Sequence, residues 1–142
     1  VFDADKLNGN SIRVHASQGG EKFNALDDKE YVLSKGMTVI SDNAGVESLA
    51  GIMGGSGSGC TDNTENVFIE AAYFNPITTA YTGRELKINS DARYRFERGI
   101  DPEWTAFGIE AATKMIIELC GGQPSEVVQA GEIPNHSKRP ID

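Results

Sequence analysis

One acidic residue, Glu70, lies inside the otherwise apolar run Val67–Phe74. Alternation along a β-strand would divide this run into two faces that are nearly all apolar, with Val67, Ile69, Ala71 and Tyr73 on one side and Phe68, Glu70, Ala72 and Phe74 on the other. This pattern is typical of a strand covered on both faces. A carboxylate removed from water without partners costs roughly several kcal/mol, so we expect Glu70 to be paired, protonated or kept for a ligand. The structural alternative places Glu70 at the open end of the strand or gives it hydrogen bonds from backbone amides.

A glycine-rich loop is expected just before this run. It spans Gly51–Gly59 and contains Gly51, Gly54, Gly55, Gly57 and Gly59. Glycines let a ligand approach the backbone and bind to amides, so this loop and Glu70 could together wall a small pocket with one specific polar contact. The structural alternative is a surface loop without a ligand. A phosphate or nucleotide site is less favoured, because the loop lacks the Gly-Lys-Ser/Thr ending of a P-loop and a strand is expected after it, not a helix.

The remaining side chains do not assemble a conventional catalytic set. With only His15 and His136, no Ser-His-Asp or Cys-His arrangement can be assigned, so any hydrolysis is expected to use a water held by backbone groups or by the substrate. The catalytic residues therefore stay unassigned. Cys60 and Cys120 have no Cys-x-x-Cys spacing, and no metal site is predicted. Two isolated cysteines suit a reducing, cytoplasmic setting, although a single disulfide between them stays open.

Length and charge limit the class of protein. The 142 residues fit one domain with a real core. The formal net charge of −8 has the wrong sign for gripping nucleic acid through its phosphates, so an RNA partner would need a local Lys/Arg patch or another domain. No apolar run approaches the roughly 20 residues that span a bilayer, so no membrane partner is expected. The chain begins at Val1 without a Met or a leader, and we interpret it as a piece of a larger protein.

The first half is expected to be rich in short strands. Ser11–Ala16 alternates as a half-buried strand with Ile12 and Val14 toward the core, and Met37–Ile40 is predicted to form another strand. The pattern over Glu21–Leu33 predicts a β-hairpin. Strands in the first half and helices in the second predict an α+β fold.

The second half carries helix signals. Helix starts are predicted after the N-cap residues Asn75, Ser90 and Asp101. The Arg-rich segment after Ser90 is interpreted as a solvated face with salt bridges. The helix after Asp101 has apolar residues at three- and four-residue steps, which predicts a buried face made of Trp104, Phe107, Ala111, Met115 and Leu119. Ser125–Ala130 is expected to be a last strand and Gly131–Asp142 a tail or linker.

Five stretches carry a likeness to a known family: Phe2–Leu7, Ala50–Gly55, Asn66–Phe74, Ser90–Ala92 and Tyr94–Pro102. In this order they resemble the editing region of the bacterial phenylalanyl-tRNA synthetase beta subunit, and the resemblance extends from Val1 to about Ala130. It implies an editing domain over residues 1–130. The implied fold is a three-layer α+β domain with a β-sandwich-like core and helices in the C-terminal half.

The resemblance also implies a function. The family's editing region hydrolyses tyrosine that has been wrongly attached to the phenylalanine tRNA, so the implied partners are the 3′ end of that tRNA, the alpha subunit and the remaining beta-subunit domains. The parent enzyme ligates phenylalanine to its tRNA with ATP and Mg in a separate synthetic site, and no cofactor is expected in this domain. The alternative is a non-catalytic module that docks other parts of the synthetase or receives the tRNA 3′ end.

Site residues are carried over from the resemblance position by position. Glu70 matches the acceptor of the tyrosine hydroxyl, Gly54 and Gly55 match the glycine loop that lines the pocket, and Ser90 and Ala92 match the pocket wall. These five residues form the expected substrate-binding site.

Two departures from the family pattern affect the expected activity. Ser90 stands where many relatives have Thr, which keeps the hydroxyl and loses a methyl group. The family also carries a functional His immediately before the position of Val1 and an Arg further upstream, and neither is in this chain. The resemblance therefore implies weak or no hydrolysis by the chain in isolation.

Overall fold

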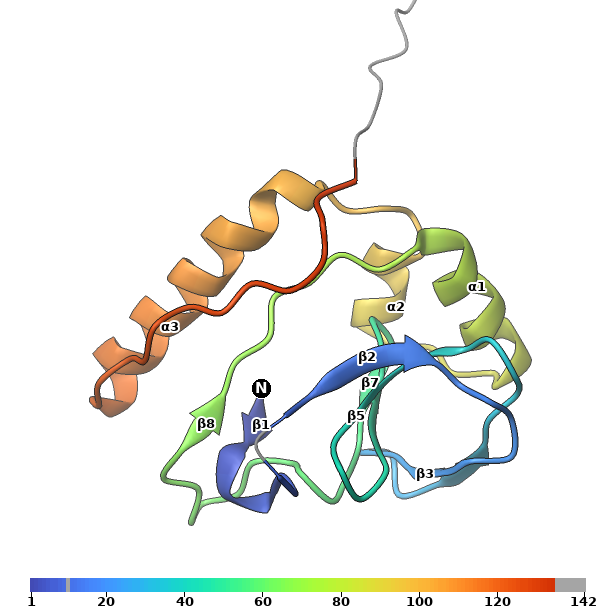
Figure 1. The fold of residues 1–142 in the computed structure, drawn as a ribbon, viewed down its shortest axis with the longest axis horizontal. Helices are drawn as coiled ribbons and strands as arrows, with labels where there is room; N and C mark the ends of the chain where they lie inside the picture. Colours follow the sequence, from blue (N-terminus) through green and yellow to red (C-terminus); the bar gives the residue numbers. More distant parts are fainter. Residues whose placement is uncertain (10, 135–142) are drawn as a thin grey trace, which may run out of the picture. The chain divides into compact units, whose positions relative to one another are not determined.

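The computed structural model describes residues 1–9 and 11–134. The strands come first: β1 (Phe2–Asp3), β2 (Arg13–Ala16), β3 (Lys22–Asn24), β4 (Glu30–Val32), β5 (Thr38–Ser41), β6 (Val46–Leu49), β7 (Met53–Gly54) and β8 (Val67–Phe68), with the 3₁₀ turn η1 (Ala4–Lys6) after β1. The helical elements follow: α1 (Pro76–Glu85), α2 (Asp91–Phe96), the 3₁₀ turn η2 (Pro102–Trp104) and α3 (Thr105–Cys120). Figure 1 shows this order along the ribbon, and the predicted α+β class is confirmed.

The strands pair into three antiparallel sheets within the described residues. The largest has the order β2-β5-β6-β7, and β1 pairs with β8 so that Phe2 lies opposite Phe68. Strands β3 and β4 form the predicted hairpin, with Phe23 opposite Tyr31. The hairpin turn contains Asp28 in the left-handed region at φ 61°, a conformation that Asp tolerates better than most residues.

One apolar cluster holds the hairpin against the four-stranded sheet. Its members come from the hairpin, from β5 and β6 with their flanking turns, and from the chain just after α1: Phe23, Ala25, Leu33, Met37, Val39, Leu49, Ile52 and Ile88. Full burial of a large apolar side chain contributes about 1.5–3 kcal/mol. The cluster therefore makes the β-rich part a packed core between two layers of strands.

The turn between β5 and β6 is built on the buried carboxylate of Asp42. Its Oδ1 accepts hydrogen bonds from the amides of Ala44 at 2.7 Å and Gly45 at 3.0 Å, and its Oδ2 accepts from the amide of Asn8 at 2.6 Å. Burial alone would raise the pKa of Asp42, but the hydrogen bonds from Asn8, Ala44 and Gly45 outweigh it and hold the pKa below its ordinary value. Asp42 thereby ties the segment before β2 to the sheet.

The predicted helix caps are present. Asn75 Oδ1 accepts from the amides of Ile77 at 2.9 Å and Thr78 at 3.2 Å, and Ser90 Oγ accepts from the amide of Arg93 at 3.1 Å. Each cap satisfies amides that have no partner inside their own helix, which explains why α1 and α2 begin where they do.

The chain divides into two compact units, Val1–Glu70 with Phe74–Ile100 and Ala71–Tyr73 with Asp101–Asp142. In the second unit, Asp101 caps η2 through the amide of Glu103, and the α-helix begins only at Thr105. The extent of the predicted domain, 1–130, stays a prediction. Residues 131–134 have no regular structure, and the rest of the predicted tail, from Asn135 onward, lies outside the described residues.

The predicted buried face of the last helix was wrong. Helix α3 has no buried residue, and the exposed side chains include Trp104 at 66% and Leu119 at 78%. The same holds for Phe107, Ala111 and Met115. Within its own unit, α3 has only a three-residue segment before it and irregular chain after it, so these supply no surface that covers the stripe.

Other strand predictions were wrong in extent or burial. The predicted strand Val67–Phe74 ends at Phe68, and both residues of the observed strand are exposed. Val14 is exposed on β2, which lies at the edge of its sheet, although Ile12 is partly buried. Ser125–Ala130 forms no strand and is exposed throughout.

Replacement of Asp42 by Ala is expected to destabilise the chain by about 1–3 kcal/mol at pH 7, because it leaves the amides of Asn8, Ala44 and Gly45 without their acceptor. Urea unfolding measures the loss. The exposed loop variant Asp62→Ala is the control and should change stability by less than about 0.5 kcal/mol.

The same pair of variants tests the lowered pKa of Asp42. A depressed folded-state pKa means that the carboxylate stabilises the fold fully above the ordinary value of 3.8 and loses this effect as the pH falls through the folded-state pKa. The difference between wild type and Asp42→Ala should therefore shrink on acidification below pH 3.8. A difference that does not depend on pH would contradict the assignment.

Candidate functional site

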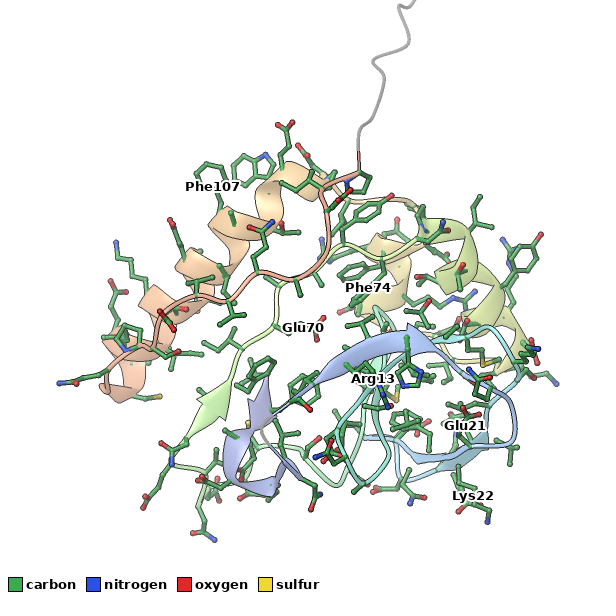
Figure 2. All side chains as sticks on the ribbon, in the orientation of Figure 1. Arg13, Glu21, Lys22, Glu70, Phe74 and Phe107 are labelled. Atoms are coloured by element: carbon green, nitrogen blue, oxygen red, sulfur yellow. The ribbon has the colours of Figure 1, made fainter. Side chains whose placement is uncertain are left out.

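Glu70 lies two residues beyond the end of β8, on an irregular segment of the first unit (Figure 2). Its side chain is half-buried. Burial raises the pKa of the Glu70 carboxyl above its ordinary value, and the positive amino group of Val1 opposes this shift. In residues 1–9 and 11–134 no hydrogen bond or ion pair of this carboxylate is described. Of the two structural alternatives for Glu70, pairing with backbone amides is not observed among these residues. Its position beyond the end of the strand is observed.

The glycine stretch was predicted as a loop, and this was wrong for its first half. Glycines hide the alternation of side chains in β7, and β6 (Val46-Glu47-Ser48-Leu49) does not alternate. The sequence therefore did not reveal that β6, a turn and β7 form a hairpin at the edge of the four-stranded sheet. The carbonyl of Gly54 accepts from the amide of Leu26 at 3.0 Å, and the amide of Gly55 donates to the carbonyl of Glu47 at 2.8 Å. Gly54 and Gly55 are thus held between the β3–β4 hairpin and β6.

Close packing explains why position 55 is a glycine. A Cβ atom on Gly55 would lie 2.8 Å from the carbonyl oxygen of Glu47 and 3.2 Å from Cε2 of Phe23. A Cβ atom on Gly54 would meet Cδ1 of Leu26 at 3.2 Å. The fold itself therefore requires Gly55, and a role of the two glycines in lining a pocket stays a prediction.

Ser90 connects α2 to the same glycine stretch. Its hydroxyl donates to the carbonyl of Ile52 at 2.6 Å and accepts from the amide of Arg93 at 3.1 Å. Both bonds are made within the protein, so the hydroxyl of Ser90 positions the turn before β7 against the start of α2. Ala92 follows on α2 and is partly buried. The structure thus brings Ser90 to the turn that precedes Gly54, while the described hydrogen bonds and ion pairs do not join Glu70 to either.

A cavity of about 390 Å³, which is a depression broadly open to solvent, lies beside α2 and is lined by Asn89, Ser90, Asp91, Arg93, Tyr94 and Glu97. Of the five predicted site residues it includes only Ser90. The sequence interpretation of this segment as a solvated face missed the cavity, because its walls come from residues whose packing depends on the preceding helix.

Arg93 shapes this cavity through contacts with both helices. Its Nη1 donates to the carbonyls of Gly83 at 3.1 Å and Ile88 at 2.6 Å, and its Nε pairs with Glu97 at 2.9 Å. The side chain is only 12% exposed. A Cβ atom on Gly83 would lie 2.3 Å from Cδ of Arg93, so the guanidinium fills the space that the glycine leaves.

The side chains that could ligate a metal ion are the His, Cys, Asp and Glu side chains in residues 1–9 and 11–134. Among the residues that the structure describes, no group of three or more His, Cys, Asp or Glu is arranged to hold a metal ion. Nε2 of His15 lies 2.9 Å from Oγ of the buried Ser41, and His136 lies outside the described residues. A search of the same described residues for a helix of sufficient length and hydrophobicity to cross a membrane found none.

The chain is similar to known proteins over nearly all of its length. The B3/4 domain family matches residues 1–121. The phenylalanine–tRNA ligase beta subunits of Ruegeria pomeroyi and Cereibacter sphaeroides are each 59% identical over 138 residues, which cover 97% of this chain and 17% of those proteins. The beta subunit of Brucella abortus is 54% identical over 142 residues. The chain spans about a sixth of the length of these curated relatives.

Replacement of Gly55 by Ala is expected to destabilise the fold by about 1–3 kcal/mol, because the new Cβ atom overlaps the Glu47 carbonyl in the backbone of β6. Gly57→Ala is the matched control, since its Cβ atom would meet only Oε2 of Glu47 at 3.9 Å. Thermal and urea unfolding of the two variants measure the effect. Equal stabilities would show that position 55 tolerates a side chain and that packing does not explain the glycine.

Glu70→Gln is expected to stabilise the chain at pH 7. Because the folded-state pKa of Glu70 lies above the ordinary 4.5, the folded state binds more protons than the unfolded state near these pH values. The free energy of unfolding therefore falls as the pH rises from 4.5 through the folded-state pKa. A neutral amide at position 70 avoids this loss of stability. The gain should vanish below pH 4.5. Urea unfolding at both pH values, with the exposed Glu65→Gln as control, measures it. A wild type more stable than Glu70→Gln at pH 7 would reveal a favourable partner for the carboxylate.

Proposed function

The chain belongs to the B3/4 domain family, and from that premise we propose that it edits tyrosine errors for a phenylalanine–tRNA ligase as part of its beta subunit. In this proposal residues 1–130 receive the 3′ end of the phenylalanine tRNA and hydrolyse the ester of a wrongly attached tyrosine. The parent enzyme joins phenylalanine to its tRNA with ATP and Mg in a separate synthetic site, together with an alpha subunit and the other beta-subunit domains, in the cytoplasm.

A second site is needed because of a limit on selectivity. A pocket shaped for phenylalanine cannot strongly reject a side chain that merely adds a hydroxyl group. A site that hydrogen-bonds this hydroxyl rejects the analogue that lacks it far better, because its own polar group is then left unpaired. An editing site for tyrosine therefore requires a desolvated polar group without a partner in the protein.

The observation that carries the proposal is the state of Glu70. Its carboxyl group is half-buried, has a raised pKa, and makes no described hydrogen bond or ion pair within residues 1–9 and 11–134. A tyrosine hydroxyl can donate to this group when it is ionised and accept from it when it is protonated, whereas phenylalanine can do neither. Leaving the group unpaired costs on the order of 1–3 kcal/mol, which favours tyrosine.

The surrounding framework supports a fixed pocket wall. The bond from Ser90 to the Ile52 carbonyl and the close contact of Gly55 with β6 hold the glycine stretch and α2 in one arrangement. We propose that Gly54 and Gly55 present backbone to the substrate and that Ser90 and Ala92 wall the site. No side chain is assigned as the catalytic base, and a water held by backbone groups or by the substrate carries out the attack in this proposal.

Replacement of Glu70 by Ala in the full-length beta subunit, assembled with its alpha subunit, is expected to raise the yield of tyrosine attached to the phenylalanine tRNA by roughly fivefold or more, because the editing site loses its hydroxyl partner. The measurement follows charging with labelled tyrosine and, in parallel, with phenylalanine. Phenylalanine charging should not change, since Glu70 lies outside the synthetic site in this proposal.

The matched control is Glu65→Ala, which removes an exposed carboxylate five residues away. It should leave the tyrosine error at the wild-type level. An unchanged tyrosine error in Glu70→Ala would favour the alternative function, a module that docks other parts of the synthetase or holds the tRNA end without chemistry.

A further inference from the structure

The cavity beside α2 is bordered by an aromatic ring with a guanidinium group stacked on it, and of the proposed tyrosine site only Ser90 lines this cavity. We propose that Tyr94 and Arg98 form a stacking platform for an unpaired nucleotide of a single-stranded RNA 3′ end. The proposal rests on the proposed function only for the source of that RNA end.

The ring and the guanidinium are already arranged for stacking. Cζ of Arg98 lies 3.7 Å from the centroid of the Tyr94 ring, and the tyrosine is 61% exposed. Nη1 of Arg98 donates to the carbonyl of Tyr94 at 2.6 Å and pairs with Glu97 at 3.2 Å. These two bonds hold the long arginine side chain in place, so binding a base loses little of its conformational freedom. Aromatic rings and guanidinium planes are the groups on which proteins stack unpaired bases.

The cavity next to the platform is open to solvent and is lined by polar and charged side chains together with the ring of Tyr94. Its volume of about 390 Å³ falls within the usual range for small-ligand sites, roughly 300–1,000 Å³. The exposed side chains of Asn89 and Asp91 line it on the side of the α1–α2 connection. An amide can both donate to and accept from a base edge, and a carboxylate can accept from a ribose hydroxyl. Arg93 and Glu97 form the less accessible wall, since they are bound to each other.

The segment that carries the platform also has a basic local charge, which suits a polyanion such as RNA. The chain carries a formal net charge of −8, but residues 84–98 hold five basic side chains against three acidic ones: Arg84, Lys87, Arg93, Arg95 and Arg98 against Glu85, Asp91 and Glu97. From the net charge of the sequence, an RNA partner is expected to need either such a local patch or another domain. An acidic peptide would suit the charge but would leave the stacked ring unused, so an unpaired nucleotide fits both features.

The test is a titration of the full chain with a 5′-labelled ribotetranucleotide, ACCA, followed by fluorescence anisotropy at low salt. Saturable binding is expected, and Tyr94→Ala should weaken it by about fivefold or more, because the base loses its stacking partner. Tyr94→Phe should bind within about twofold of wild type, since it keeps the ring. Arg98→Gln should bind more weakly and with a smaller dependence on salt.

The matched control is Tyr81→Ala, which removes a tyrosine of similar exposure, 66%, on the neighbouring helix α1 and outside the cavity lining. It should leave the affinity unchanged. Absence of saturable binding, or equal affinities for Tyr94→Ala and Tyr81→Ala, would overturn the proposal.

The outcome is separable from that of the editing proposal. Glu70→Ala should leave the affinity for the oligonucleotide unchanged, because Glu70 does not line the cavity. If the oligonucleotide binds as expected but Glu70→Ala leaves the tyrosine error unchanged, the stacking platform is supported and the editing proposal is contradicted. The reverse result would keep editing and remove the platform.

Discussion

The close approach of Gly55 to the backbone of β6 is the constraint on which the β-rich part depends. The amide of Gly55 bonds to the Glu47 carbonyl at 2.8 Å, and there is no space for a side chain between that strand and the ring of Phe23. This contact lets the β3–β4 hairpin lie against the sheet, and Phe23 is then almost completely buried in the common core. The glycines that suggest a binding loop in the sequence therefore have a demonstrable packing role first.

A second level of order comes from polar groups that link elements distant in sequence. Ser90 bonds to the Ile52 carbonyl across 38 positions, and Arg93 reaches back to Gly83 and Ile88. These bonds place the start of α2 against the β6–β7 hairpin and the end of α1. The candidate pocket wall and the cavity beside α2 thus share Ser90, whose hydroxyl accepts a hydrogen bond from the amide of Arg93, whereas Tyr94 lines only the cavity.

Local signals were readable in the sequence and non-local ones were not. The caps at Asn75 and Ser90 act within three residues of the helix start, and the β3–β4 hairpin closes over a short turn, so both were predicted correctly. Strand β7 was missed because it is two residues long and contains a glycine, and β6 was missed because its sequence Val46-Glu47-Ser48-Leu49 does not alternate. The pairing of β8 with β1, which is distant in sequence, is revealed by no local pattern. Within the site, the burial of Glu70 was predicted from its apolar neighbours. The hydrogen bond from Ser90 to Ile52 and the stacking of Arg98 on Tyr94 were not predicted, because they depend on the packing of elements and on side-chain geometry.

The carboxyl groups of Glu70 and Asp42 have opposite effects on the stability of the fold when they ionise. The carboxylate of Asp42 is surrounded by amides that lower its pKa, so ionisation stabilises the turn that it builds. The carboxyl group of Glu70 is partly buried and has no described hydrogen bond or ion pair, so its ionisation opposes folding. A group selected for stability alone would be replaced by an amide or an apolar residue at position 70. In the proposed editing role, a tyrosine hydroxyl supplies the hydrogen bond that the carboxyl group of Glu70 lacks among the described residues.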